Sequence, residues 1–114
     1  KIFGNNRNDL EDIINDSIKL QNAGAIALLL EGMKTKIAKK ITTITNIPTI
    51  GIGASEFCDG QILVSEDMLG MFTEYHPKFV KKYTNLSHNI KIAVKKYVSE
   101  IDQMKFPNKN YRYD

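Results

Sequence analysis

Apolar residues in the first third of the chain follow a helical spacing and then a continuous run. Between residues 9 and 23 they recur every three or four positions, which predicts an amphipathic helix. Its apolar face comprises Leu10, Ile13, Ile14 and Ile18. Asn8 and Glu11 fit a capping box at the start of this helix, and Gly24 fits a left-handed C-cap. The apolar run 25–30 then predicts a parallel strand covered by helices on both faces.

The alternation of helix and strand patterns continues as far as residue 65. Residues 34–45 predict a second helix, residues 49–54 a strand that ends in a glycine-containing turn, and residues 61–65 a third strand. The apolar face of the second helix comprises Ile37, Ala38, Ile41 and Ile44. Helices and strands in this order, with short connections, predict an α/β fold built on a parallel sheet or barrel.

The last third of the chain is expected to be mainly helical. Residues 67–72 predict a short helix or a loop, and Pro77 fits the first turn of a further helix. The apolar members of that helix are Phe79, Val80 and Tyr83. Residues 87–104 predict a long amphipathic helix, followed by a polar, turn-rich tail over residues 107–114. The apolar face of the long helix comprises Ile90, Ala93, Val94, Tyr97, Val98 and Ile101.

Composition is that of an ordinary soluble domain. The 114 residues are 42% hydrophobic and 25% charged, which argues against a disordered, collagen-like or disulfide-rich chain. The single cysteine fits a reducing compartment, and no apolar run approaches the roughly 20 residues that cross a bilayer. The net charge of +3 is too small to indicate a nucleic-acid partner by itself. The chain begins with Lys1 rather than Met, and we expect it to be a piece of a longer protein.

Glu31 is the strongest candidate for chemistry. It follows the apolar run directly, so it is expected at the carboxyl end of a parallel strand, where α/β folds place their functional residues. Partial burial there would raise the pKa of the carboxyl group and make it a usable general base. The alternative is that Glu31 only pairs with a neighbouring lysine.

The glycines and the remaining acids give weaker signals. Gly51 and Gly53 could present backbone N–H groups to an anion. The third glycine of a dinucleotide-binding fingerprint is absent, however, so a tight turn is the favoured interpretation. Asp59, Glu66 and Asp67 could bind a hard cation, although solvated turn and cap positions are the commoner role of such acids.

The cysteine, the histidines and the basic C-terminal residues have no clear functional pattern. Cys58, His76 and His88 lack the spacing of a zinc site, and no base stands beside Cys58 to stabilise a thiolate. Residues 78–114 carry nine basic and three acidic groups and could form a nucleic-acid patch. The tyrosines are expected on the apolar helical face, though, and the lysines opposite them on a solvated face. These residues are Lys81, Lys82, Lys91, Lys95 and Lys96, with Tyr83 and Tyr97.

Several distinctive segments follow one another along nearly the whole chain. They are Ala23-Gly24-Ala25 with Leu28–Glu31, Ile47–Ala54, Cys58–Val64, Asp67–Gly70, Pro77–Tyr83 and Phe106-Pro107. In sequence and order they resemble the C-terminal part of the ketopantoate hydroxymethyltransferase family. The resemblance implies a (β/α)8 TIM-type barrel, of which residues 1–114 would form the C-terminal part of a single domain. That part would comprise about three βα units and the terminal helices, without the N-terminal strands.

The resemblance also implies a reaction. Enzymes of this family condense 3-methyl-2-oxobutanoate with the one-carbon unit of 5,10-methylenetetrahydrofolate and form 2-dehydropantoate, on the route to pantothenate and coenzyme A. Mg²⁺ chelates the keto acid, and a glutamate at a strand end accepts its C3 proton; this proton acceptor maps onto Glu31. The metal ligands and a substrate-positioning lysine map upstream of this chain, so the resemblance assigns no residue here to the metal.

Further expectations come from the same resemblance. Ser55 stands where the family usually has glycine, so the shape of its loop is in question. We expect a cytoplasmic homo-oligomer, a decamer as in the family, with small-molecule substrates and no nucleic-acid or membrane partner. Alone, the 114 residues are expected to be inactive and prone to aggregate through exposed strand edges. Two alternatives stay open: a basic module that binds an acidic partner, and a non-catalytic chain that still docks into the oligomer.

Overall fold

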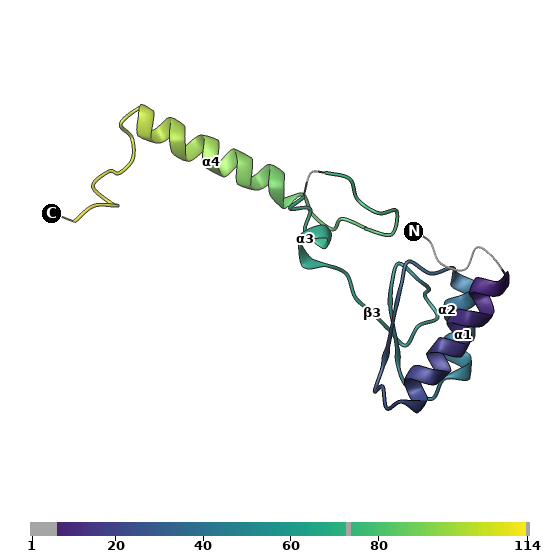
Figure 1. Ribbon diagram of the computed structural model, residues 1–114. Coiled ribbons are helices and arrows are strands. Elements are labelled where there is room, and N and C mark those ends of the chain that lie inside the picture. Colours follow the sequence, from purple (N-terminus) through teal and green to yellow (C-terminus); the bar gives the residue numbers. More distant parts are fainter. Residues whose placement is uncertain (1–6, 73, 114) are drawn as a thin grey trace. The chain divides into compact units, whose positions relative to one another are not determined.

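The computed structural model describes residues 7–72 and 74–113, which fall into two compact units. One contains the described residues up to Val64 together with His76–Val80, and the other contains Ser65–Tyr75 and the chain from Lys81 onwards. The elements, labelled in Figure 1, are α1 (Arg7–Asn22), β1 (Leu28–Glu31), α2 (Thr35–Ile44), β2 (Thr49–Ile52), β3 (Gly60–Gln61), α3 (Ser65–Met68) and α4 (Leu86–Asp102).

The first unit is built on a three-stranded parallel sheet of order β1-β2-β3. Leu28 lies opposite Thr49, and Glu31 lies opposite Ile52. The strand β3 is paired only with the middle of β2, where Gly60 lies opposite Ile50. The prediction of a mixed α/β fold with parallel strands is therefore confirmed.

The chain reverses between α1 and β1 through a glycine, as predicted. Gly24 has a φ of +99°, a region that is open to glycine because it lacks a Cβ. Its N–H donates to the carbonyl of Gln21 (3.0 Å), and the N–H of Ala25 donates to the carbonyl of Leu20 (3.1 Å). This pair of hydrogen bonds is the Schellman arrangement that satisfies the last carbonyls of a helix.

The start of α1 differs from the prediction. The helix begins at Arg7, so Asn8 lies inside it rather than at the N-cap. Periodicity locates the apolar face of a helix well and its first residue less well, because the first turn need not contribute to that face. The side-chain hydrogen bonds expected of the Asn8 and Glu11 capping box lie outside what the structure describes.

The core of this unit lies between the sheet and the two helices, which cover the same face of the sheet (Figure 1). The buried cluster comprises Leu28, Leu30, Ile37, Ala38, Ile41 and Cys58. Between two buried leucines of β1, Leu29 is 59% exposed, because side chains alternate between the faces of a strand. The expectation that β1 is covered on both faces is thus wrong for the described chain, which supplies a helical layer on one face only.

Two predicted elements are shortened or absent. The strand expected over residues 61–65 is limited to Gly60–Gln61, because β2 ends at Ile52 and the last bond toward it runs from the N–H of Ile62 to the carbonyl of Gly51 (3.0 Å). The helix expected to begin at Pro77 is a single turn, closed by a bond from the N–H of Val80 to the carbonyl of Pro77 (3.0 Å).

In the second unit, residues 83–87 are bonded to the last residue of α3 and to the two residues after it. The N–H groups of Tyr83 and Leu86 donate to the carbonyls of Met68 (2.8 Å) and Leu69 (2.9 Å). These non-local bonds replace the helical ones that a continuing helix would make, which explains why no helix spans this segment. The short helix α3 falls close to the predicted one.

The long helix α4 is present as predicted, but its apolar face is not buried. Asn85 caps it, its side-chain oxygen accepting from the N–H of His88 (3.3 Å). The large apolar residues of the expected face are between 42% and 54% exposed; they are Ile90, Val94, Tyr97, Val98 and Ile101. An apolar stripe predicts where a helix can pack. In the described chain, the apolar stripe of α4 is covered only in part. No helix among the described residues is long and apolar enough to cross a membrane.

Candidate functional site

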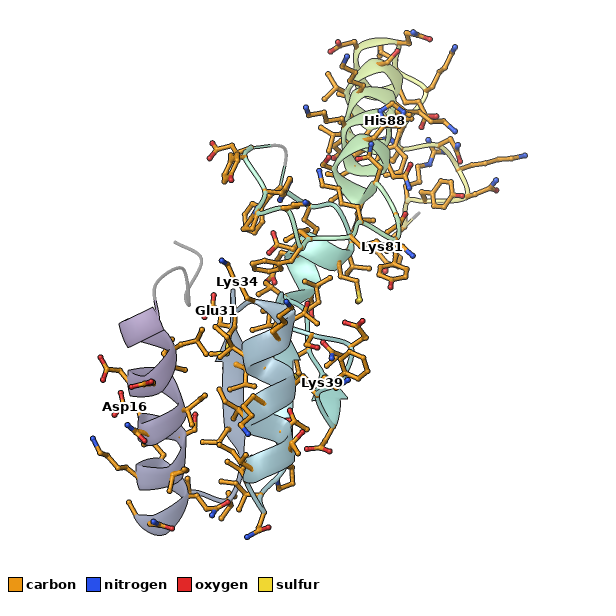
Figure 2. The ribbon with its side chains drawn as sticks, turned by 90° about the vertical axis from the view of Figure 1, so that its right-hand side faces the viewer. Asp16, Glu31, Lys34, Lys39, Lys81 and His88 are labelled. Atoms are coloured by element: carbon orange, nitrogen blue, oxygen red, sulfur yellow. The ribbon has the colours of Figure 1, made fainter. Side chains whose placement is uncertain are left out.

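Glu31 is the last residue of β1, at the carboxyl end of the parallel sheet. Its neighbours Leu28 and Leu30 point into the core beneath the helices. Because side chains alternate along a strand, Glu31 lies with Leu29 on the opposite, uncovered face. Figure 2 shows Glu31 and Lys34 at the same end of the sheet. The position that the sequence predicted for Glu31, at a strand end, is therefore confirmed.

The backbone around Glu31 is held on both sides. The parallel ladder begins with a bond from the N–H of Leu28 to the carbonyl of Pro48 (2.9 Å), and the N–H of Gly32 donates to the carbonyl of Ile52 (3.0 Å). Beyond it, the hydroxyl of Thr35 makes a long bond to the carbonyl of Ala54 (3.5 Å). The end of β1 is thus hydrogen-bonded to the end of β2 and to the segment that follows it. These bonds fix the position of the Glu31 backbone.

The Glu31 carboxylate has no internal partner in the part of the chain that the structure describes. It accepts no hydrogen bond there, and its side chain is exposed. The alternative interpretation, an ion pair with a neighbouring lysine such as Lys34, is not observed. The expected partial burial is not observed either, since the Glu31 side chain is exposed although Ile52, its partner in the ladder, is buried. The carboxylate is available to a molecule bound from outside.

Gly51 makes room for a side chain that crosses the sheet. A Cβ at this position would lie 2.9 Å from Oε1 of Gln61 and 3.1 Å from Sγ of Cys58. The Gln61 amide donates from Nε2 to the carbonyl of Ser55 (2.7 Å), and so ties β3 to the loop after β2. Gly51 therefore serves close packing inside β2 rather than a turn, and only Gly53, with a φ of +61°, has the backbone of the predicted turn.

Ser55 fits inside the loop that its side chain was expected to disturb. It is 6% exposed, and its hydroxyl oxygen accepts from the N–H of Phe57 (3.1 Å). A serine hydroxyl that bonds to the backbone two residues ahead stabilises a turn. In this chain, then, Ser55 supports the loop after β2 rather than distorting it.

Asp59 has a structural role that sequence analysis missed. Its Oδ2 accepts from the N–H (2.8 Å) and the hydroxyl (3.2 Å) of Thr49, which is fully buried, and its own N–H donates to that hydroxyl oxygen (3.3 Å). The hydroxyls of Thr49 and Thr42 lie 2.8 Å apart and share a further bond. The sequence signal for this role was a threonine at the start of a predicted buried strand. The hydroxyl of such a threonine needs a hydrogen-bond partner.

The other acids, the cysteine and the histidines do not come together in one site among the described residues. Glu66 and Asp67 lie in the first turn of α3, in the other unit from Asp59. The residues that the structure describes contain no group of three or more His, Cys, Asp or Glu side chains able to hold a metal ion. Cys58 is buried in the core as a free thiol, and His88 lies in the first turn of α4.

Among the basic residues and tyrosines of the second unit, Lys81 and Tyr83 are not separated as predicted. Tyr83 lies outside any helix and is 68% exposed, and the Nζ of Lys81 lies 4.9 Å from the centre of its ring. Tyr97 packs edge-on against Phe106, with ring centres 5.7 Å apart. A surface pocket in this unit is lined by Phe72, Lys82, Asn85, Ser87, His88 and Lys91. All five lysines are exposed, as expected of a solvated face, and two of them, Lys82 and Lys91, also line this pocket.

Comparison with known sequences decides the family. The profile described as ketopantoate hydroxymethyltransferase matches residues 1–109. The chain belongs to the ketopantoate hydroxymethyltransferase family. The resemblance carried by the segments between Ala23 and Pro107 is thereby confirmed at the level of the family. That the chain is the C-terminal part of such an enzyme stays a prediction.

Relatives in this family are identical to the chain at almost half of the aligned positions. A 3-methyl-2-oxobutanoate hydroxymethyltransferase of Clostridium kluyveri is 46% identical over 113 residues, which are 99% of this chain and 40% of the relative. Those of Clostridium acetobutylicum and Aliarcobacter butzleri are 47% and 44% identical, with 41% and 42% of their lengths covered. The chain therefore spans about 40% of the length of the curated relatives it matches.

Proposed function

We propose that Glu31 is the proton acceptor in a hydroxymethyl transfer from 5,10-methylenetetrahydrofolate to 3-methyl-2-oxobutanoate, which yields 2-dehydropantoate. Membership of the ketopantoate hydroxymethyltransferase family supports the reaction class. The observation that carries the role of Glu31 is its place at a strand end, with an exposed carboxylate that has no partner among the described residues. Such a carboxylate can accept a proton without first breaking an internal hydrogen bond.

The proposed step is a general-base reaction. Glu31 takes the proton from C3 of the keto acid, and the resulting enolate forms a carbon–carbon bond with the methylene carbon of the folate. Both bonds from that carbon to the folate nitrogens break, and water supplies the hydroxyl oxygen of the product. The proton taken up by Glu31 and the second proton of the water end on the two nitrogens, so tetrahydrofolate is released. A positioned base contributes roughly 10²–10⁴-fold to such a proton transfer. The fastened strand end gives Glu31 the fixed starting point that this requires.

Mg²⁺, which the family uses, does not fit the residues described here. A protein-built site for this ion needs oxygen ligands that converge. In the described parts of the chain, Asp59 is engaged by Thr49, and no three acidic, histidine or cysteine side chains come together. We therefore derive no step through the metal from this chain. The role proposed for it is limited to the proton and to the fixed position of Glu31.

A chimaeric enzyme tests the proposal. The 113 matched residues of the Clostridium kluyveri relative are replaced by this chain, and formation of 2-dehydropantoate is assayed with both substrates and Mg²⁺. Glu31→Gln is expected to lower kcat by about 10²–10⁴-fold, because the amide cannot accept the proton. The matched control is Glu11→Gln, an exposed carboxyl on α1, which should leave kcat unchanged. Activity of Glu31→Gln within a few-fold of the parent would refute the assignment.

The chain on its own provides the complementary measurement. We expect the 114 residues alone to be inactive and to self-associate, because Leu29, on the sheet face that no described helix covers, is 59% exposed. Turnover by the isolated chain would overturn this expectation. A homo-oligomeric, decameric assembly and a cytoplasmic location are part of the same proposal.

One observation favours the alternative of a basic interaction module. The pocket in the second unit is lined by Lys82, Lys91 and His88, groups that would attract an anionic partner. Binding of this kind weakens steeply as salt is raised. Titration of the chain with heparin or duplex DNA at two salt concentrations decides the matter, and absence of salt-dependent binding would exclude the module.

A further inference from the structure

We infer that Phe79 is a positioning residue for Glu31 and acts through the backbone that follows β2; this rests on the proposed role of Glu31 as the base. Phe79 is distant in sequence from β2 but belongs to the same compact unit. It lies in the turn that is closed by the bond from the N–H of Val80 to the carbonyl of Pro77. Its ring is half-buried.

The ring of Phe79 occupies the space that a side chain at Gly53 would need. A Cβ built on Gly53 would fall on the Cγ and Cδ1 atoms of the ring. Gly53 also has a φ of +61°, which L side chains rarely adopt. Both features require glycine here, and the missing Cβ lets the ring lie directly against the backbone at the point where β2 ends.

The residues on either side of Gly53 are the ones that hold the chain beyond Glu31. The carbonyl of Ile52 accepts the N–H of Gly32 (3.0 Å), and the carbonyl of Ala54 accepts the hydroxyl of Thr35 (3.5 Å). A ring pressed on Gly53 limits movement of both acceptors at once. Phe79 therefore restrains the strand end from which the Glu31 carboxylate projects.

Phe79 is placed to act locally rather than as part of the main core. The buried cluster between sheet and helices includes Leu28, Leu30 and Ile41 but not Phe79. Loss of the ring should therefore loosen the carboxyl end of the ladder and leave its amino end intact. Local openings of this kind are visible in amide hydrogen exchange.

The first test measures amide hydrogen exchange in the chimaeric enzyme, by mass spectrometry with fragmentation that resolves single amides. Phe79→Ala should speed exchange of the Gly32 amide by about 10-fold or more, and change that of Leu28, at the other end of the same ladder, by less than about 2-fold. The matched control is Phe57→Ala, an exposed ring of the loop after β2 (47%), which should alter neither amide. Unchanged exchange at Gly32, or an equal increase at both amides, would overturn the inference. If Phe79→Ala does not fold, Phe79→Leu is compared by the same criterion.

The second test separates this inference from the proposed function. In the chimaeric enzyme, Phe79→Ala should lower kcat by about 10-fold with little change in KM, and should add no further loss to Glu31→Gln. Equal losses in both backgrounds would show a general structural effect and contradict the inference. If Glu31→Gln itself leaves kcat unchanged, the proposed function fails, and the exchange experiment still decides whether Phe79 holds the strand end.

Discussion

The Asp59 carboxylate accepts both the backbone N–H and the hydroxyl of Thr49, at 2.8 and 3.2 Å. Thr49 is the first residue of β2 and is completely buried. A buried donor that loses its partner costs more than an average hydrogen bond contributes. This contact therefore fixes the start of the central strand, while the bond between Gly32 and Ile52 holds the end near Glu31.

Asp59→Ala should destabilise the chain by about 1–3 kcal/mol, because it leaves the buried N–H of Thr49 without its acceptor. Asp59→Asn keeps an oxygen acceptor and should cost less. Urea unfolding followed by circular dichroism measures both. The control is Asp16→Asn, whose carboxylate pairs with Lys19 at 3.4 Å on the surface, and a change below about 0.5 kcal/mol is expected there. Equal, negligible effects of both Asp59 variants would contradict the role of this contact.

Gly51→Ala tests the packing of Gln61 over β2. Replacing glycine by alanine in a strand is favourable by about 0.5–1 kcal/mol in backbone entropy. Here the new Cβ would lie 2.9 Å from Oε1 of Gln61, whose amide cannot move away without losing its bond to Ser55. Crowding of this kind costs about 1–3 kcal/mol, so we expect net destabilisation in urea unfolding.

The double variant Gly51→Ala/Gln61→Ala is the control for this prediction. Removal of the Gln61 side chain relieves the crowding, so the two changes should be clearly non-additive. Additive losses would mean that Gly51 and Gln61 do not interact. A stabilising effect of Gly51→Ala would mean that the Gln61 side chain moves away from the new Cβ at little cost in free energy.

The difference in burial between α2 and α4 predicts different costs of truncation. Ile41 is fully buried, and Ile41→Ala should cost about 2–5 kcal/mol. Val98 of α4 is 48% exposed, and Val98→Ala should change stability by less than about 0.5 kcal/mol. Both are measured on the chain by urea unfolding. A large cost at Val98 would show that the apolar face of α4 is buried in solution, for example against a second copy.

The helices and the first reversal could be predicted because they depend on neighbours in sequence. The apolar spacing of residues 9–23, 34–45 and 87–104 and the glycine at position 24 are sufficient for α1, α2, α4 and the Schellman turn. The position of Glu31 could be predicted in the same way, because it is the first charged residue after an apolar run. It is the last residue of β1. Membership of the ketopantoate hydroxymethyltransferase family was likewise visible in the order of its sequence segments.

The predictions that were wrong concern elements whose length depends on contacts with segments distant in sequence. The length of β3 depends on where β2 ends, and the segment after Pro77 forms a single turn whose Phe79 ring fills the space beside Gly53. The hydrogen bonds between Asp59 and Thr49, which sequence analysis missed, also join residues ten positions apart.

Sequence by itself determined the family, the helices and the strand-end position of Glu31, because periodicity and local turn chemistry carry that information. Tertiary structure alone decided that the Glu31 carboxylate is exposed, that Ser55 supports its loop, and which backbone groups hold the strand end. Those properties depend on which side chains and carbonyls meet across the sheet, and packing between segments far apart in the chain determines that.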